Sequence, residues 1–303
     1  MSEVQKTLEK AKENEQEGSF DKAARNYYTA AQLTNDIRLY NRAFFTARKS
    51  GRSDLMFETA KSYHEMLSQG NEQAKVNELL PTFLEISGRE RDRLAEEAPE
   101  KMVEVLDWTI SLFQLVGKPE AAYDFSIQTG DAYFSFGKQL LSSSSLIGKE
   151  EKWQRGLDLF DKAIEAYQKI RTDTQSLGKV LEVQLDRIDK LIDIGRHVEG
   201  IEGTTGLMDY HKTNSEIVPY SREVLSSKVA DIFASKSVNY ARNKKFDIAD
   251  VLMKTAKAGF ENAGKYTEIP PYLWQLALIY DEHNQKDHFY ALTDTTFDMA
   301  LKY

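Results

Sequence analysis

The side chains best suited to chemistry in this sequence are the basic residues between Arg38 and Arg52. Arg38, Arg42, Arg48, Lys49 and Arg52 occur there without an intervening Asp or Glu. Guanidinium groups bind carboxylates through paired N–H donors, and an ammonium adds a point charge. This composition predicts noncovalent recognition of acidic groups.

The spacing of these residues places most of them on one face of a helix. Positions i, i+3, i+4, i+7, i+10 and i+11 form one stripe along a helix. The basic stripe, as we name it, consists of Arg38, Asn41, Arg42, Phe45, Arg48 and Lys49. The remaining positions, Tyr40, Ala43, Phe44 and Ala47, face the packing side. We predict that the basic stripe binds a partner. The alternative is a solvated basic face whose counter-charges come from neighbouring helices.

Other clusters of polar residues fit structural roles better than chemical ones. His283 and His288 are five residues apart, whereas a zinc-binding helix needs histidines four apart. The segment 130–139 has the wrong spacing for a phosphate loop, and its aromatic residues recur at helical spacing, which indicates core packing. The glycines at 200, 203 and 206 lack the preceding strand of a dinucleotide site. We therefore predict no catalytic residue, no cofactor and no metal, and we expect that the protein is not an enzyme.

Helices must position the basic stripe, because apolar residues recur with a period of 3.6 through most of the chain. Gly18, Gly51, Gly88 and Gly117 are predicted to close helices. Pro99, Pro119 and Pro219 stand near predicted helix starts. The predicted helices are 2–17, 20–34, 37–50, 53–69, 72–87, 100–116, 119–142, 149–171, 175–196, 219–243, 246–264, 270–283 and 286–302.

Two segments interrupt this helical pattern. The serine-rich segment 142–148 is predicted to be a flexible loop. The segment 200–219 combines several glycines with weak periodicity, and we predict a hinge or an inserted loop there. We nevertheless expect residues 1–303 to form a single domain.

A recurring set of small and aromatic residues relates the helices to one another. The first copy has the spacing A-x6-G-x-F-x2-A-x3-Y-x2-A and consists of Ala11, Gly18, Phe20, Ala23, Tyr27 and Ala30. Further copies include Phe246, Ala249, Met253 and Ala256 near the C-terminus. This pattern resembles the tetratricopeptide (TPR) repeat. The resemblance implies an all-α, right-handed superhelix of about six helical hairpins. Some TPR domains clamp a carboxylate from the first helix, and the corresponding positions here, Leu8 and Lys12, provide only part of that clamp.

The irregular repeat length, about 35–45 residues, also resembles the soluble NSF attachment protein (SNAP) family. Another TPR-like protein of similar length is the epsilon subunit of the COPI coat. The SNAP resemblance implies a basic face that contacts a coiled-coil bundle, a hexameric ATPase as a further partner, and peripheral membrane contact. The turn Glu17–Phe20 is shorter than the membrane-contacting loop of that family, and Leu301 stands one position away from the family's terminal leucine.

Composition limits the remaining possibilities. The net charge of −8 disfavours general binding to nucleic acid. The absence of cysteine excludes thiolate metal sites and disulfides and fits a cytoplasmic location. No stretch is apolar for long enough to span a membrane. We therefore predict a protein-interaction scaffold or adaptor that binds an acidic or coiled-coil partner, with a SNAP-like role in vesicle fusion or complex disassembly as one version. The alternatives are a coat-like assembly subunit, or a small-ligand receptor or enzyme built in a helical array.

Overall fold

The computed structural model describes residues 2–97, 99–142, 150–290 and 292–293, and every regular element within them is helical. The all-α prediction is therefore confirmed. The chain divides into two compact units, Met1–Thr129 and Gly130–Tyr303, and the boundary lies inside helix α7. The prediction of one domain over residues 1–303 stays a prediction.

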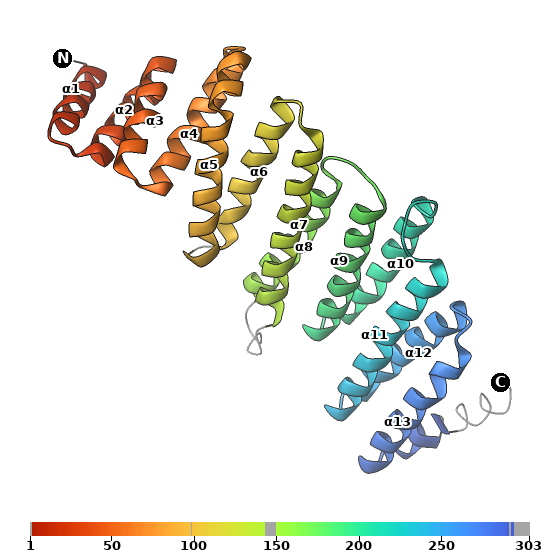
Figure 1. Cartoon of the computed structure of the whole chain (residues 1–303). Helices are drawn as coiled ribbons and strands as arrows, with labels where there is room; N and C mark the ends of the chain where they lie inside the picture. The colour runs from red at the N-terminus through yellow and green to blue at the C-terminus, as the bar shows by residue number, and fades with distance from the viewer. Residues whose placement is uncertain (1, 98, 143–149, 291, 294–303) are drawn as a thin grey trace. The chain divides into compact units, whose positions relative to one another are not determined.

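The first unit is built from helices that follow one another in space as they do in the sequence (Figure 1). Turns of a few residues connect them, so successive helices run antiparallel and form hairpins. These helices are α1 (Glu3–Gln16), α2 (Phe20–Thr34), α3 (Ile37–Ser50), α4 (Ser53–Gln69), α5 (Gln73–Glu97), α6 (Pro99–Leu115) and the first half of α7 (Pro119–Ser142).

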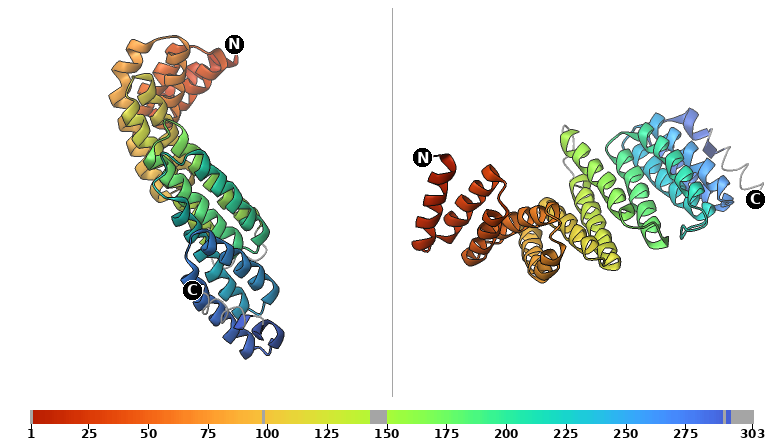
Figure 2. Two further views of the ribbon diagram at one scale, coloured as in Figure 1. Left: turned by 90° about the vertical axis from the view of Figure 1, so that its right-hand side faces the viewer. Right: turned by 90° about the horizontal axis from the view of Figure 1, so that it is seen from above.

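The second unit continues with the same kind of hairpin, and all views show its neighbouring helices side by side (Figures 1 and 2). After the second half of α7 it contains α8 (Glu150–Gln168), α9 (Thr174–Asp193), α10 (His197–Thr213), α11 (Arg222–Arg242), α12 (Phe246–Asn262), the short 3₁₀ helix η1 (Tyr266–Glu268) and α13 (Ile269–Glu282). Residues 286–290 begin a further helix, whereas most of the predicted helix 286–302 and the predicted loop 142–148 lie outside the described residues.

Local signals set the ends of α3, the helix that carries the basic stripe. The side chain of Asp36 accepts a hydrogen bond from the backbone N–H of Arg38 at 2.9 Å, which caps the first turn. Gly51 ends the helix with φ +70°, a left-handed conformation that glycine adopts at little cost. The sequence prediction of 37–50 therefore matches the helix bounds.

Aromatic side chains hold the first unit together behind α3. The ring of Phe44 lies 5.8 Å from Tyr63 of α4 and 5.7 Å from Phe83 of α5, measured between centroids. Phe83 in turn lies 5.7 Å from Trp108 of α6. All four side chains are buried. Because this cluster joins four consecutive helices, it fixes the orientation of α3 and hence the direction in which the basic stripe faces.

Helix α5 is longer than predicted. The sequence indicated an end at Gly88, but the helix continues to Glu97, and a Cβ on Gly88 would meet no neighbouring atom within 4 Å. Ser87 shares a hydrogen bond with Thr109 of α6, and Leu94 is buried. Packing of the later turns therefore outweighs the weak helix propensity of one glycine, and the prediction that Gly88 closes a helix is wrong.

The inserted loop predicted at 200–219 is also wrong for residues up to Thr213, which belong to α10. The glycines there allow α9 and α10 to approach closely. A Cβ on Gly200 would lie 3.0 Å from Ile192, and one on Gly203 would lie 3.3 Å from Ile188. Glycine thus serves as a contact residue at these positions. Composition alone does not distinguish this role from that of a glycine that ends a helix.

The segment 130–139 lies within α7, as the helical spacing of its aromatic residues indicated, and its glycines make close contacts that the sequence did not predict. A Cβ on Gly130 would lie 2.4 Å from the ring of Tyr167, and one on Gly137 would lie 2.6 Å from the ring of Phe160. Both glycines therefore let α8 lie directly against α7, and the segment is a helix interior and not a phosphate loop. Among the described residues, no helix combines the length and the apolarity that a bilayer span requires.

Candidate functional site

The basic stripe lies on the exposed face of α3, as the spacing predicted. Arg38, Arg42, Arg48 and Lys49 are exposed, Phe45 is 39% exposed, and Asn41 is half-buried. The opposite positions, Tyr40, Ala43, Phe44 and Ala47, are buried. The assignment of the two faces of α3 is confirmed, whereas partner binding by the stripe stays a prediction.

A single carboxylate from another helix meets two cations of the stripe. Glu15 of α1 accepts a hydrogen bond at 2.9 Å from the Arg42 guanidinium, and its other oxygen lies 3.6 Å from the Lys49 ammonium. Tyr27 of α2 donates its hydroxyl proton to Glu15 at 2.9 Å. The Arg42 guanidinium also lies over the Tyr27 ring, 5.3 Å from its centroid. Counter-charge from a neighbouring helix, the alternative considered for the stripe, is therefore present at two of its positions.

These contacts change the protonation of Glu15. Burial by itself would raise the pKa of this carboxyl, but the hydrogen bonds from Arg42 and Tyr27 and the charges of Arg42 and Lys49 outweigh it. The net effect lowers the pKa of Glu15 below its usual 4.5. Glu15 is therefore an anion at neutral pH, and its side chain is only 19% exposed.

Two other cations of the stripe are more available. Arg38 binds Asp36, the cap of its own helix, through two nitrogens at 3.2 Å, but its side chain is 86% exposed. Arg48 has no ion-pair or hydrogen-bond partner in the described part of the chain. The Nδ2 group of Asn41 donates to the hydroxyl of Tyr63 at 2.6 Å, so Asn41 helps to position a neighbour and is not a free donor.

A hollow of about 580 Å³ borders the stripe between α1, α2 and α3. Its walls combine apolar side chains with charged ones, and Lys12 has no ion-pair partner within the described ranges. Figure 1 shows the three helices side by side at the N-terminal end of the first unit. The hollow is lined by Leu8, Lys12, Glu15, Gln16, Tyr27, Leu39 and Arg42.

Glu15 was not among the residues predicted for this site, although the sequence contained a signal for it. Leu8 and Lys12 were placed on the first helix of the first repeat, four residues apart on one face. The same spacing continued by three residues reaches Glu15. The spacing of residues along the chain does not give the distance between α1 and α3. In the structure these helices are close enough for Glu15 to contact Arg42 and Lys49 of the second hairpin.

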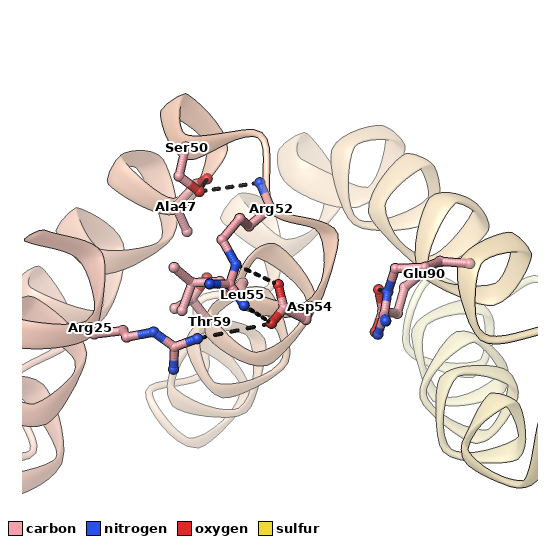
Figure 3. A network of polar contacts seen from close by, with 9 residues as sticks. Arg25, Ala47, Ser50, Arg52, Asp54, Leu55, Thr59 and Glu90 are labelled. Carbon is pink, nitrogen blue, oxygen red and sulfur yellow. Dashed lines mark hydrogen bonds and ion pairs between the residues drawn. The ribbon is translucent and has the colours of Figure 1, made fainter. Parts of the chain in front are cut away.

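The last cation of the basic run, Arg52, belongs to a different cluster (Figure 3). Its guanidinium binds Asp54 through two nitrogens, at 3.1 and 2.5 Å, and Arg25 of α2 lies 3.9 Å from the same carboxylate. The hydrogen bond from Arg52 lowers the pKa of Asp54. Arg52 is therefore neutralised locally and adds nothing to the basic stripe.

Asp54 borders a second hollow of about 570 Å³, which α2, α4, α5 and α6 line. Its charges are mixed and mostly paired. The buried Glu90, seen on the right of Figure 3, binds Arg93 at 2.6 Å, and Lys61 lies 2.7 Å from Glu104. The lining has five carboxylates and three cations, so this hollow has a small acidic excess and does not suit an acidic ligand.

Three lysines of the second unit are paired with aspartates of other helices. Lys179 of α9 lies 3.0 Å from Asp131 of α7, and Lys138 of α7 lies 2.8 Å from Asp186 of α9. Lys236 of α11 lies 2.8 Å from Asp189 of α9. These ion pairs connect the first helices of successive hairpins. The lysines of the second unit named here are therefore neutralised within the fold, unlike Arg48 and Lys12 in the first unit.

The two histidines considered for a metal site have separate neighbours. His288 lies 2.8 Å from Asp250, and the ring of His283 lies 5.8 Å from that of Phe246. In the part of the chain that the structure describes, no three His, Asp or Glu side chains gather closely enough to hold a metal ion.

Comparison with known proteins returns helical repeat structures. No family model matches this chain, and no curated protein sequence matches it. A circular tandem repeat protein with novel repeat topology is 12% identical, with coverage of 99% of this chain and 78% of that chain and a TM-score of 0.32. The TPR2AB-domain–pHSP90 complex of yeast Sti1 is 16% identical, with coverage of 90% and 98% and a TM-score of 0.21. Yeast Tom70 is 12% identical, with coverage of 99% and 77% and a TM-score of 0.21. Similarities of this size identify no partner.

Proposed function

We propose that this chain is a non-catalytic interaction scaffold whose first unit binds an acidic segment of another protein through the basic stripe of α3. The observation that carries the proposal is the exposure of Arg38 and Arg48 on a helix that buried aromatic residues hold in place. Because the core holds the backbone of α3 in place, its exposed guanidinium groups are presented from a fixed helix, where they can pair with a partner's carboxylates.

The character of the surface favours a protein over a nucleic acid. Phe45 lies exposed within the stripe, and the adjacent hollow has Leu8 and Leu39 in its walls. Apolar contacts of this kind suit a partner that combines acidic and apolar side chains.

An amphipathic acidic helix is the partner shape that this stripe would suit. Arg38 and Arg48 are ten residues apart on α3, which corresponds to about 15 Å along the helix axis. A partner helix lying along α3 could place acidic residues at both ends and an apolar residue on Phe45. A coiled-coil partner, as in a SNAP-like role in vesicle fusion or complex disassembly, would offer that arrangement. So would a subunit of a coat-like assembly.

Binding of a fluorescent amphipathic peptide, with glutamates on one face and leucines on the other, tests this proposal. The double variant Arg38→Ala/Arg48→Ala should weaken binding about tenfold, since two charged contacts are lost. Lys10→Ala is a suitable control, because Lys10 is an exposed cation on α1 that forms no ion pair with the stripe in the described part of the chain and does not line the hollow. Equal binding by the wild type and the double variant, with both helical by circular dichroism, would overturn the proposal.

A further inference from the structure

The carboxylate of Glu15 already occupies part of the surface to which the proposed function assigns an acidic partner. It comes from α1, yet it contacts Arg42 and Lys49 of α3, at 2.9 and 3.6 Å. It also lines the hollow beside the stripe. The single negative charge of Glu15 is therefore shared by two of the four cations of the basic stripe, and it partly offsets them at a position that an incoming carboxylate would approach.

The surroundings of Glu15 form a carboxylate-binding site in their own right. Three donors from two other helices converge on it: the guanidinium of Arg42, the ammonium of Lys49 and the hydroxyl of Tyr27. The Tyr27 ring lies under Arg42, and the ring of Phe20 lies 5.5 Å from the Lys49 ammonium, so aromatic faces help to hold both cations. Donors fixed in this way bind a carboxylate with little loss of side-chain freedom.

We infer that Glu15 is an internal competitor, which holds the Arg42–Lys49 pair until a partner's carboxylate takes its place or lies beside it, and so limits the affinity of the basic stripe. This inference rests on the proposed function. Glu15 would then set specificity as well as affinity. A partner with a single acidic residue would find only Arg38 and Arg48 available, whereas a partner with several would gain enough to compete for Arg42 and Lys49.

The variant Glu15→Gln isolates this effect. The glutamine keeps a carbonyl oxygen that can accept from Arg42 and Tyr27, but it removes the negative charge. A partner carboxylate about 6 Å away would no longer be repelled, which at low salt corresponds to roughly three- to tenfold tighter binding of the acidic peptide. Glu13→Gln, with the same change of charge at an exposed position outside the hollow, is the matched control.

Two further measurements test whether the gain is electrostatic and whether it depends on the cations that Glu15 holds. The gain from Glu15→Gln should shrink as salt is raised, because screening weakens contacts between exposed charges. The gain should also be smaller when Glu15→Gln is added to Arg42→Gln than when it is added to the wild type, because one of the two cations that Glu15 holds is then absent. Thermal unfolding of each variant confirms that the helices remain folded.

The possible results distinguish the inference from the proposed function. Tighter binding by Glu15→Gln than by both the wild type and Glu13→Gln supports the inference. Equal binding by Glu15→Gln and Glu13→Gln overturns it and leaves the proposed function standing. Weaker binding by Glu15→Gln also overturns it, because Glu15 would then be positioning the cations for the partner. Failure of every form to bind the peptide overturns the proposed function, and the inference with it.

Discussion

Replacing two glycines of the second unit by alanine should change its stability in opposite directions. Gly130 lies in α7 against Tyr167, and a Cβ there would come within 2.4, 2.5 and 2.8 Å of three ring atoms. The ring cannot easily turn away, because it is buried and its hydroxyl donates to Asp131 at 2.7 Å. Gly206 lies in α10, where a Cβ would meet nothing within 4 Å.

The magnitudes follow from these distances. Carbon atoms pack best at about 3.5–4.0 Å, so Gly130→Ala forces a shift of roughly 1 Å between α7 and α8. Overpacking of this kind lowers the free energy of unfolding by about 1–3 kcal/mol. The better helix propensity of alanine offsets up to about 1 kcal/mol of this loss. Gly206→Ala has only the gain in propensity and should stabilise by about 0.5–1 kcal/mol.

Thermal unfolding followed by circular dichroism measures both effects. For a unit of this size, Gly130→Ala should lower the midpoint by roughly 5 °C, and Gly206→Ala should raise it by a smaller amount. A destabilised Gly206→Ala would refute the helical assignment of α10, since alanine is disfavoured where glycine has a positive φ. An unchanged midpoint for Gly130→Ala would refute the close packing of α7 on α8.

Two further predictions concern buried ionisable groups. Burial lowers the pKa of His64 below 6.5, so the unfolded chain binds a proton first as the pH falls, and the free energy of unfolding should decrease below pH 6.5. His64→Gln keeps an acceptor for the indole N–H of Trp108, which donates at 3.4 Å, and should remove this part of the pH dependence in urea titrations. Lys236→Met leaves Asp189 without its 2.8 Å partner, and denaturant unfolding should show a loss of about 1–3 kcal/mol. Unchanged stability of Lys236→Met would mean that Lys190 alone compensates Asp189.

The parts of the fold that the sequence predicted well are those with strong local signals. The bounds of α2, α3 and α4 were predicted without error, because Asn35 and Gly51 end helices in left-handed conformations and Asp36 caps the next one. The two faces of α3 followed from the helical period alone. Such features depend on residues close together in the sequence, so composition and spacing are sufficient to locate them.

The errors arose where tertiary packing gives a residue a different role. Gly88 and Gly200 were both predicted to interrupt helices. Gly88 instead lies inside a long helix, and Gly200 lets α10 pack against Ile192. Glu15 was missed for a related reason. Its contacts with Arg42 and Lys49 join the first and second hairpins, and nothing in the spacing of α1 shows how near α3 lies.

Photo-crosslinking from the centre of the basic stripe tests the central claim most directly. Benzoyl-phenylalanine in place of Phe45 would introduce a reactive group of similar shape at an exposed position flanked by the stripe cations. The same group in place of Val251, an exposed residue of the second unit, is the control. We predict that the Phe45 position captures, from native extract, a protein whose crosslinked segment is acidic, and that excess acidic peptide or added salt suppresses the adduct. Adducts that are basic or neutral, that consist of nucleic acid, or that match those of the Val251 position would contradict the account.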